Sequence, residues 1–264
     1  MKRPKISIIT ICFNSEKHIE ECICSVLNQN YENKEYIVID GGSTDKTISI
    51  LNKYRDKIDY FVSEKDNGIS DAFNKGILAS TGELIGICNS DDVLANDILS
   101  KVAEVWDEET DIYRFNEVIK NFETGEEWLV KPSLVYGKRI IKNQACHMGC
   151  FITKKAYNRY GMYDVNLKSS MDTDLLRRFT VKKAKYKYVP LVVGFFRKGG
   201  VSGDPRLRNK ERNIIIRRYG GTWWDVFCSM AYHLTFQWTK RILVLIGGDD
   251  LATRLKAKYL VRKD

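Results

Sequence analysis

Strand and helix signals alternate along the first hundred residues, and this alternation constrains the fold more than any other feature. Apolar runs expected for buried strands lie at 6–12, 36–39 and 84–88, with a shorter one at 59–62. Segments with helical spacing lie between them, at 15–28, 45–54 and 68–80. This order predicts an α/β fold with a mostly parallel sheet and helices on both faces.

Polar clusters follow three of these predicted strands. They are Phe13-Asn14, Asp40-Gly41-Gly42 and Asn89-Ser90-Asp91-Asp92. Ligands of parallel sheets bind beyond the carboxyl ends of the strands. We therefore expect these distant segments to converge on one ligand site.

The rest of the chain is less regular. The sequence predicts a hairpin from 112–121 and 127–130, helices at 153–160 and 172–180, and one or two strands at 186–196. We expect a catalytic domain at 1–205, with a nucleotide-binding half at about 1–95 and an acceptor half at about 96–205, and a helical extension at 206–264. The most apolar stretch, 223–246, is interrupted by polar and charged residues and does not predict a membrane span.

Positive charge is concentrated in the extension. From Arg206 onward there are 13 Lys/Arg and 5 Asp/Glu, a net +8, whereas the first 205 residues carry 30 minus 29, or +1. A basic tail of this kind predicts an anionic partner. Nucleic acid is not predicted, because no binding motif accompanies the charge.

Adjacent carboxylates make Asn89-Ser90-Asp91-Asp92 the leading chemical candidate. Two neighbouring carboxylates repel unless a cation or solvent separates them. Mg²⁺ and Mn²⁺ are commonly held by one or two carboxylates together with substrate phosphates. The alternative is that Asp91 or Asp92 caps a helix that begins near Leu94.

Three further candidates each have a structural alternative. Asp40 could accept hydrogen bonds from a ribose or a base, or belong to an ordinary strand-to-helix turn. Asp172 could be a general base, or, like Asp174, favour the start of a helix electrostatically. His147 could contact a substrate, although a lone histidine is more often structural. The seven cysteines, odd in number and mostly in apolar runs, predict free thiols rather than a zinc site.

Five blocks together resemble family 2 glycosyltransferases of the GT-A fold. Four of them cover about the first 95 residues: Ile6–Asn14, Val38–Asp45, Asp66–Gly76 and Thr81–Asp92. Met171–Arg178 is similar to the second acidic block of that family. One position departs from the pattern, because Asn89 stands where the family often has aspartate and supplies an acceptor oxygen without the charge.

The resemblance implies roles for individual residues. Ile11, Phe13, Asp40, Asn67 and Gly68 would surround the nucleotide. Asp91 would serve the ribose and the metal, Asp92 would bind Mn²⁺ or Mg²⁺, and Asp172 would be the base. Asn89 and His147 would contact acceptor or donor sugar.

The resemblance also implies an activity and its setting. The chain would transfer a sugar, with inversion, from a nucleoside diphosphate sugar, first of all a UDP-sugar, to a saccharide or lipid-linked saccharide in surface-polysaccharide synthesis. Residues 222–264 combine aromatic and basic residues, which predicts either attachment to an anionic membrane on the cytoplasmic face or packing on the catalytic domain or a second copy. A nucleotidyltransferase and an inactive nucleotide-sugar-binding protein are the alternatives.

Overall fold

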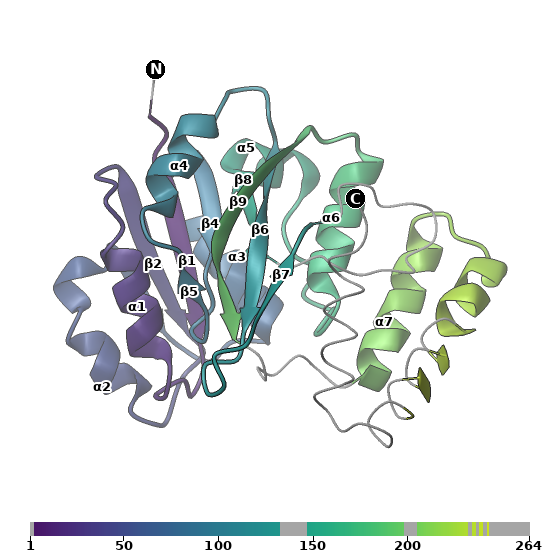
Figure 1. The fold of residues 1–264 in the computed structure, drawn as a ribbon, viewed down its shortest axis with the longest axis horizontal. Coiled ribbons are helices and arrows are strands. Elements are labelled where there is room, and N and C mark those ends of the chain that lie inside the picture. The colour runs from purple at the N-terminus through teal and green to yellow at the C-terminus, as the bar shows by residue number, and fades with distance from the viewer. Residues whose placement is uncertain are drawn as a thin grey trace.

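One sheet runs through the molecule, with helices on both faces (Figure 1). The computed structural model describes residues 3–132, 147–197 and 205–231, together with residues 234, 235, 238, 239 and 242. Along the described strands the order is β3-β2-β1-β4-β8-β6-β9-β5, with β7 paired to β6. The predicted α/β class is confirmed.

The first half of the sheet is parallel, as predicted. Its strands are β1 (Ile6–Cys12), β2 (Lys34–Asp40), β3 (Tyr60–Ser63) and β4 (Leu84–Ile87). They are connected by α1 (Ile19–Leu27), α2 (Thr47–Asn52), the short 3-10 helix η1 (Arg55–Lys57) and α3 (Ile69–Ala79). Each helix begins one to four residues later than the sequence pattern predicts.

The second half of the sheet is mixed rather than mostly parallel. Its strands are β5 (Val93–Leu94), β6 (Ile112–Lys120), β7 (Glu127–Val130), β8 (Cys150–Thr153) and β9 (Tyr186–Arg197). Its helices are α4 (Ile98–Val105), α5 (Lys154–Tyr160), α6 (Met171–Val181) and α7 (Pro205–Arg218). β8 is antiparallel to both β4 and β6, and β6 and β7 form the predicted hairpin.

The expected helix near Leu94 is absent, which corrects one reading of the acidic cluster. Val93 and Leu94 pair instead with Phe195 and Gly194 of β9, and α4 begins only at Ile98. Asp91 and Asp92 therefore cap no helix, and their side chains are available for another role.

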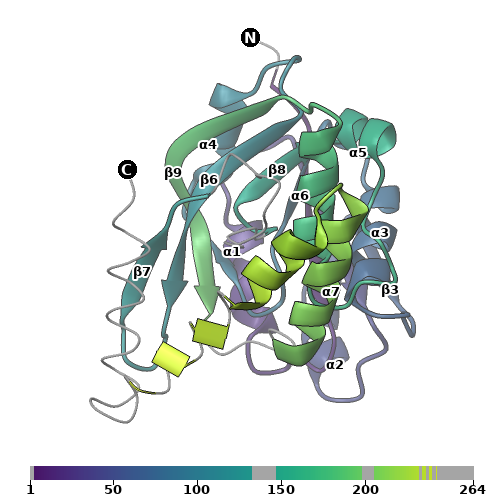
Figure 2. The same cartoon turned by 90° about the vertical axis from the view of Figure 1, so that its right-hand side faces the viewer.

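Two hydrophobic cores lie on opposite faces of the sheet. Residues of α1, α2 and α4 pack against one face, and residues of α3, α5, α6 and α7 against the other (Figures 1 and 2). Side chains of β1 alternate between the two, since Ile8 points into one core and Ile9 and Ile11 into the other.

The start of the basic extension shares the second core. Ile215 and Ile216 of α7 are buried there, and so is Val226. The proposed boundary near residue 206 therefore marks a change of composition, and the core continues through it. No helix in the described part of the chain is long and apolar enough to cross a bilayer. The six described cysteines are free thiols, while Cys146 lies outside the described residues.

Candidate active site

Segments that follow β1, β2 and β4 meet at one edge of the sheet, as expected. The Oδ1 atom of Asn14 accepts a hydrogen bond from the backbone N–H of Thr44 at 2.9 Å. The hydroxyls of Ser15 and Ser90 are 2.7 Å apart. These contacts join the carboxyl ends of three neighbouring strands into one surface. β1 lies between β2 and β4 in the sheet, and ligands of parallel sheets bind where the strand order reverses in this way.

Asp40 does not face a ligand, which corrects its expected role. Its carboxylate is fully buried and accepts hydrogen bonds from the backbone N–H groups of Gly42 and Ser43 at 3.0 and 2.9 Å. The hydroxyls of Ser43 and Ser63 also donate to it, the latter at 2.7 Å. With both oxygens occupied inside the protein, Asp40 shapes the turn after β2 and offers no acceptor to a nucleotide.

Asp66 lies next to Gly41, at the carboxyl ends of the strands. A side chain at Gly41 would meet the Asp66 carboxylate, and the ring of Phe13 lies beside the same point. Asp66 is half-buried and its Oδ1 atom accepts the N–H of Gly68 at 2.9 Å, which fixes the turn before α3. This acid lies in one of the blocks that carry the family resemblance, but its position over Gly41 is visible only in the structure.

Of the other residues expected to contact the nucleotide, some are accessible at the surface and one is buried in the core. Phe13 is 61% exposed at the end of β1, where its ring can stack on a base. Asn67 is exposed and Gly68 half-buried beside it, with Gly68 at a φ of 108° that favours glycine. The side chain of Ile11, in contrast, is buried in the core, so its expected contact with the nucleotide is wrong for the side chain.

The acidic loop after β4 holds one half-buried and one fully buried carboxylate. Asp91 is half-buried, whereas Asp92 is inaccessible to solvent. Burial, followed by the charge of Asp91, raises the pKa of Asp92 well above its ordinary value. The only hydrogen bond to the Asp92 carboxylate among described residues is a long one, 3.3 Å from the N–H of Arg197 to Oδ1.

His147 and Asp172 form a pair beside this loop. The Nδ1 atom of His147 lies 3.1 Å from Oδ2 of Asp172, at the start of α6. Burial alone would lower the pKa of His147, but the carboxylates of Asp172, Asp92 and Glu117 outweigh it and raise the pKa to about 9. His147 is therefore a cation at neutral pH that donates to Asp172, and it lies close enough to Asp92 to interact with its charge.

Several of the predicted site residues present buried polar atoms that have no hydrogen-bond partner. Among described residues these include Asn89 Oδ1, Asp92 Oδ2, His147 Nε2 and Asp172 Oδ1. Buried polar groups are nearly always paired, so unpartnered ones need an explanation. The oxygen atoms of Asn89 and Asp92 fit a divalent cation, whereas the N–H of the His147 cation and the Oδ1 atom of Asp172 fit a polar substrate.

The fit to a metal depends on the substrate. No group of three or more His, Cys, Asp or Glu side chains in the described residues is arranged to hold a metal ion by itself. Asn89, Asp91 and Asp92 supply oxygen ligands on one side only, as in sites where substrate phosphates complete the coordination of Mg²⁺. These residues fit a metal that enters with a diphosphate.

Two residues that sequence reasoning missed hold α6 in place. Glu211 of α7 accepts the backbone N–H groups of Lys168, Ser169 and Ser170 at 2.8, 2.9 and 2.8 Å. These residues lead directly into α6 and Asp172. Only the charge pattern of α7, a single acid among six basic residues, hinted at a special role for Glu211.

Arg218, at the end of α7, makes a second connection to α6. Its Nη1 atom lies 2.7 Å from Oδ1 of Asp174 and 2.8 Å from Oδ2 of Asp164. Asp174 is buried and also accepts from the hydroxyl of Tyr219 at 3.0 Å. Asp174 does lie in the first turn of α6, as expected of a helix-start acid, but it is buried and also joins α6 to the basic extension.

Comparisons with known proteins identify the family and the fold. The chain is 42% identical over 104 residues to an uncharacterized glycosyltransferase of Haemophilus influenzae, an alignment that covers 38% of this chain and 42% of that protein. Alignments with the next two curated relatives cover 37% and 58% of their lengths, so the chain spans about half of these proteins.

Solved structures share the fold over most of the chain. S. aureus TarS in complex with UDP superposes with a TM-score of 0.62 at 20% identity, covering 81% of this chain and 65% of that one. The mannosyltransferase PcManGT from Pyrobaculum calidifontis, in complex with GDP-Man and Mn²⁺, gives 0.64 at 17% identity, covering 100% and 89%. The sequence profile described as glycosyl transferase family 2 matches residues 7–165, more than half of the 264. The protein therefore belongs to glycosyl transferase family 2.

Proposed function

We propose that the protein transfers a sugar from a nucleoside diphosphate sugar to a hydroxyl of a saccharide or lipid-linked saccharide, with inversion at the anomeric carbon. The observation that carries this proposal is the pair of unpartnered carboxylate oxygens on Asp92, in the loop after β4, and on Asp172, at the start of α6. They come from different elements, and the His147 cation contacts Asp172 and interacts with the charge of Asp92. Two acids on opposite sides of a ligand suit departure of a leaving group and deprotonation of a nucleophile.

The donor would bind along the ends of β1 to β4. We assign stacking of the base to Phe13, and polar contacts with the nucleoside to Asp66, Asn67 and Gly68 in place of the inward-facing Asp40. UDP and GDP are the nucleotides to test first, since TarS has been solved with UDP and PcManGT with GDP-Man. Asp91 would serve the ribose and, with Asp92, the cation.

Asn89, Asp91 and Asp92 would hold Mn²⁺ or Mg²⁺ together with the donor diphosphate. A divalent cation there would stabilise the negative charge that grows on the departing diphosphate. The residues themselves exclude water from the buried side of the loop and orient the donor.

Asp172 would act on the acceptor side. Its Oδ2 atom is held by His147, which leaves Oδ1 to accept the proton of the attacking hydroxyl. The acceptor oxygen then forms the new bond to the anomeric carbon while the bond to the diphosphate breaks on the opposite face. His147 is a positioning residue in this scheme, since it acts through Asp172. Asn89 and His147, which also have unpartnered polar atoms, are the candidates for contacts with the donor or acceptor sugar.

A screen of UDP- and GDP-sugars for donor hydrolysis, with Mn²⁺ and with chelator, tests this proposal. We expect release of the nucleoside diphosphate from a restricted set of donors, and its loss with chelator. Pyrophosphate released from a nucleoside triphosphate would instead indicate a nucleotidyltransferase. Binding of donors without any turnover would indicate an inactive binding protein, and either result would refute the proposal.

The role of Asp92 has a matched control a few residues along the chain. Asp92→Asn should lower turnover roughly 100-fold or more, since charge stabilisation by a metal contributes several kcal/mol. Asp97 is exposed and adopts a left-handed conformation, which asparagine tolerates well. Asp97→Asn should therefore leave both turnover and nucleotide affinity unchanged. Equal nucleotide affinity of the wild type with Mn²⁺ and with chelator, measured by calorimetry, would contradict the metal assignment.

A further inference from the structure

A row of large apolar side chains after α7 is exposed to solvent at helical spacing. We call it the aromatic stripe; it consists of Trp223, Phe227, Met230, Leu234, Trp238 and Ile242, with Trp224 beside it. Trp223 is 73% exposed and Trp238 65%. Steps of three and four residues place these side chains along one face of a helix. A soluble surface rarely leaves so many large apolar groups together in water.

The stripe is not the face by which this segment packs on the protein. That role belongs to Asp225, Val226 and Ser229, which are buried, with Val226 in the second core. The helix that carries these residues begins at Trp223, and Thr222 and Asp225 cap each other at its start. The N–H of Thr222 donates to the Asp225 carboxylate at 2.8 Å, and the N–H of Asp225 donates to the Thr222 hydroxyl at 3.2 Å. The apolar stripe thus lies on a side that the described protein leaves uncovered.

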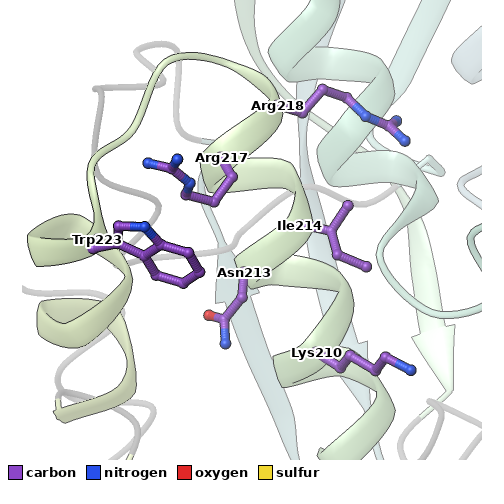
Figure 3. Close-up of a pocket in the computed structure, with 6 residues that line it drawn as sticks. All are labelled: Lys210, Asn213, Ile214, Arg217, Arg218 and Trp223. Carbon is purple, nitrogen blue, oxygen red and sulfur yellow. The ribbon is translucent and has the colours of Figure 1, made fainter.

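A pocket on the surface of α7 begins beside Trp223, with Arg217 extending toward that ring and Lys210 and Arg218 extending to the other side of the helix (Figure 3). The pocket has a volume of about 490 Å³ and is lined by Lys210, Asn213, Ile214, Arg217, Arg218 and Trp223. The guanidinium of Arg217 lies 4.8 Å from the ring centre of Trp223, the first residue of the stripe. Arg218 is ion-paired, but Lys210 and Arg217 form no ion pair with any described residue.

We propose that the aromatic stripe and the pocket cations dock the protein on a bilayer that carries anionic headgroups. Tryptophan side chains favour the headgroup level, where the ring is buried and the indole N–H stays near water, and Lys and Arg beside them attract anionic lipid. A two-fold contact with a second copy fits less well. It would bring Lys210 and Arg217 toward the same cations of the other copy.

The connection between α7 and α6 gives this docking a consequence for the active site. Glu211 lies one residue after Lys210 and holds the backbone that leads into α6 and Asp172. α7 also packs beside α6, so a bilayer bound on α7 would lie near the helix that carries the candidate base (Figures 1 and 2). If the proposed function holds, the acceptor hydroxyl belongs to a lipid-linked saccharide that reaches Asp172 from the membrane surface.

Co-sedimentation of the full chain with vesicles tests the docking. We expect binding to phosphatidylglycerol-containing vesicles that weakens with salt, and little binding to phosphatidylcholine alone. Lys210→Gln with Arg217→Gln should weaken it roughly 30-fold, since each cation near such a surface contributes about fivefold. Replacement of Trp223, Phe227 and Trp238 by serine should abolish it. Leu78→Ser and Lys182→Gln, which alter exposed residues on other helices or turns, are the controls and should bind as the wild type does.

Tryptophan fluorescence provides a second measurement. Three of the five tryptophans belong to the stripe or lie beside it, so vesicles should shift the emission of the wild type to shorter wavelength. Wild-type protein that ignores anionic vesicles at low salt would overturn the proposal. So would a dimer in solution that the serine variant converts to monomer while vesicle binding is absent in both.

Donor hydrolysis without vesicles keeps the two proposals apart. The serine variant should hydrolyse donor at the wild-type rate, because the stripe lies outside the donor site. Vesicle binding without turnover of any nucleotide sugar would refute the proposed function and leave the docking intact. Turnover without vesicle binding would refute the docking alone.

Discussion

Asp172 and Asp174 lie two residues apart on α6, and their replacement by asparagine should have different effects, on turnover and on stability respectively. Asp172→Asn keeps the shape of the side chain and removes the proton acceptor. Turnover should fall by roughly 10²–10⁴, the range for loss of a general base. That loss corresponds to about 3–5 kcal/mol of transition-state stabilisation. Nucleotide affinity should persist, since the nucleotide binds at the ends of β1 to β4.

Asp174→Asn should reduce stability instead. The Asp174 carboxylate is buried and accepts from Arg218 at 2.7 Å and from Tyr219 at 3.0 Å, with Arg178 at 3.5 Å. Breaking a buried ion pair costs about 3–5 kcal/mol. The side chain of Arg218 is 38% exposed and keeps Asp164 as a partner, so solvent screening reduces the expected loss to about 1–3 kcal/mol. For a chain of this size the melting temperature should fall by roughly 3–9 °C.

Three measurements on both variants separate these effects: the initial rate of nucleotide release, calorimetric nucleotide affinity, and thermal unfolding. The expected pattern is an Asp172→Asn protein that is slow even at temperatures where it is fully folded, and an Asp174→Asn protein that is active below a lowered melting temperature. Wild-type turnover in Asp172→Asn would refute the assignment of the base. Lost turnover in Asp174→Asn with an unchanged melting temperature would exchange the two roles.

Two further predictions concern the groups that hold Asp172. Because the folded-state pKa of His147 is raised from 6.5 to about 9, its stabilisation is complete below pH 6.5 and is lost as the pH rises through 9. The unfolding free energy should fall by up to about 3 kcal/mol over this window, and denaturant titrations of His147→Gln should lack that fall. Glu211→Gln should lower the free energy of unfolding by about 2 kcal/mol and slow turnover, because weaker hydrogen bonds to the backbone loosen the start of α6. Glu123 is exposed, so Glu123→Gln should change neither stability nor turnover. An unaltered melting temperature and rate in Glu211→Gln would show that this contact is dispensable.

The parallel half of the fold could be predicted because its signals are local. The apolar runs of β1, β2 and β4 and the helical spacing between them are visible within windows of about ten residues. Convergence of Phe13, Asp40 and Asn89 followed from a general rule about parallel sheets. The position of β5 was not predictable in this way, because Val93 and Leu94 become a strand only through pairing with β9, about a hundred residues later.

Contacts between distant segments account for the rest of what sequence reasoning missed. The clamp of Glu211 on the start of α6 joins residues more than forty positions apart. The neighbouring sequence identifies Asp174 as an acid at a helix start. Its hydrogen bonds with Arg218 and Tyr219, which join α6 to the basic extension, are visible only in the structure. In both cases the partner of the charged residue lies on another element of the same core, which the neighbouring sequence does not reveal.

Asp40 and Asp92 show why burial alone does not identify a functional acid. Both follow core strands and both are inaccessible to solvent. Asp40 accepts two backbone N–H groups and a hydroxyl at Oδ2 and a second hydroxyl at Oδ1, so its charge is satisfied within the protein. Asp92 has one long hydrogen bond, an unpartnered Oδ2 atom and a neighbouring acid that raises its pKa. A buried carboxylate in that state either stays protonated or destabilises the fold, unless a cation beside it offsets its charge. The unsatisfied acid is therefore the one for which we propose a ligand. The contrast with Asp40 supports the proposed cation in the loop after β4 more strongly than the acidic pair in the sequence does.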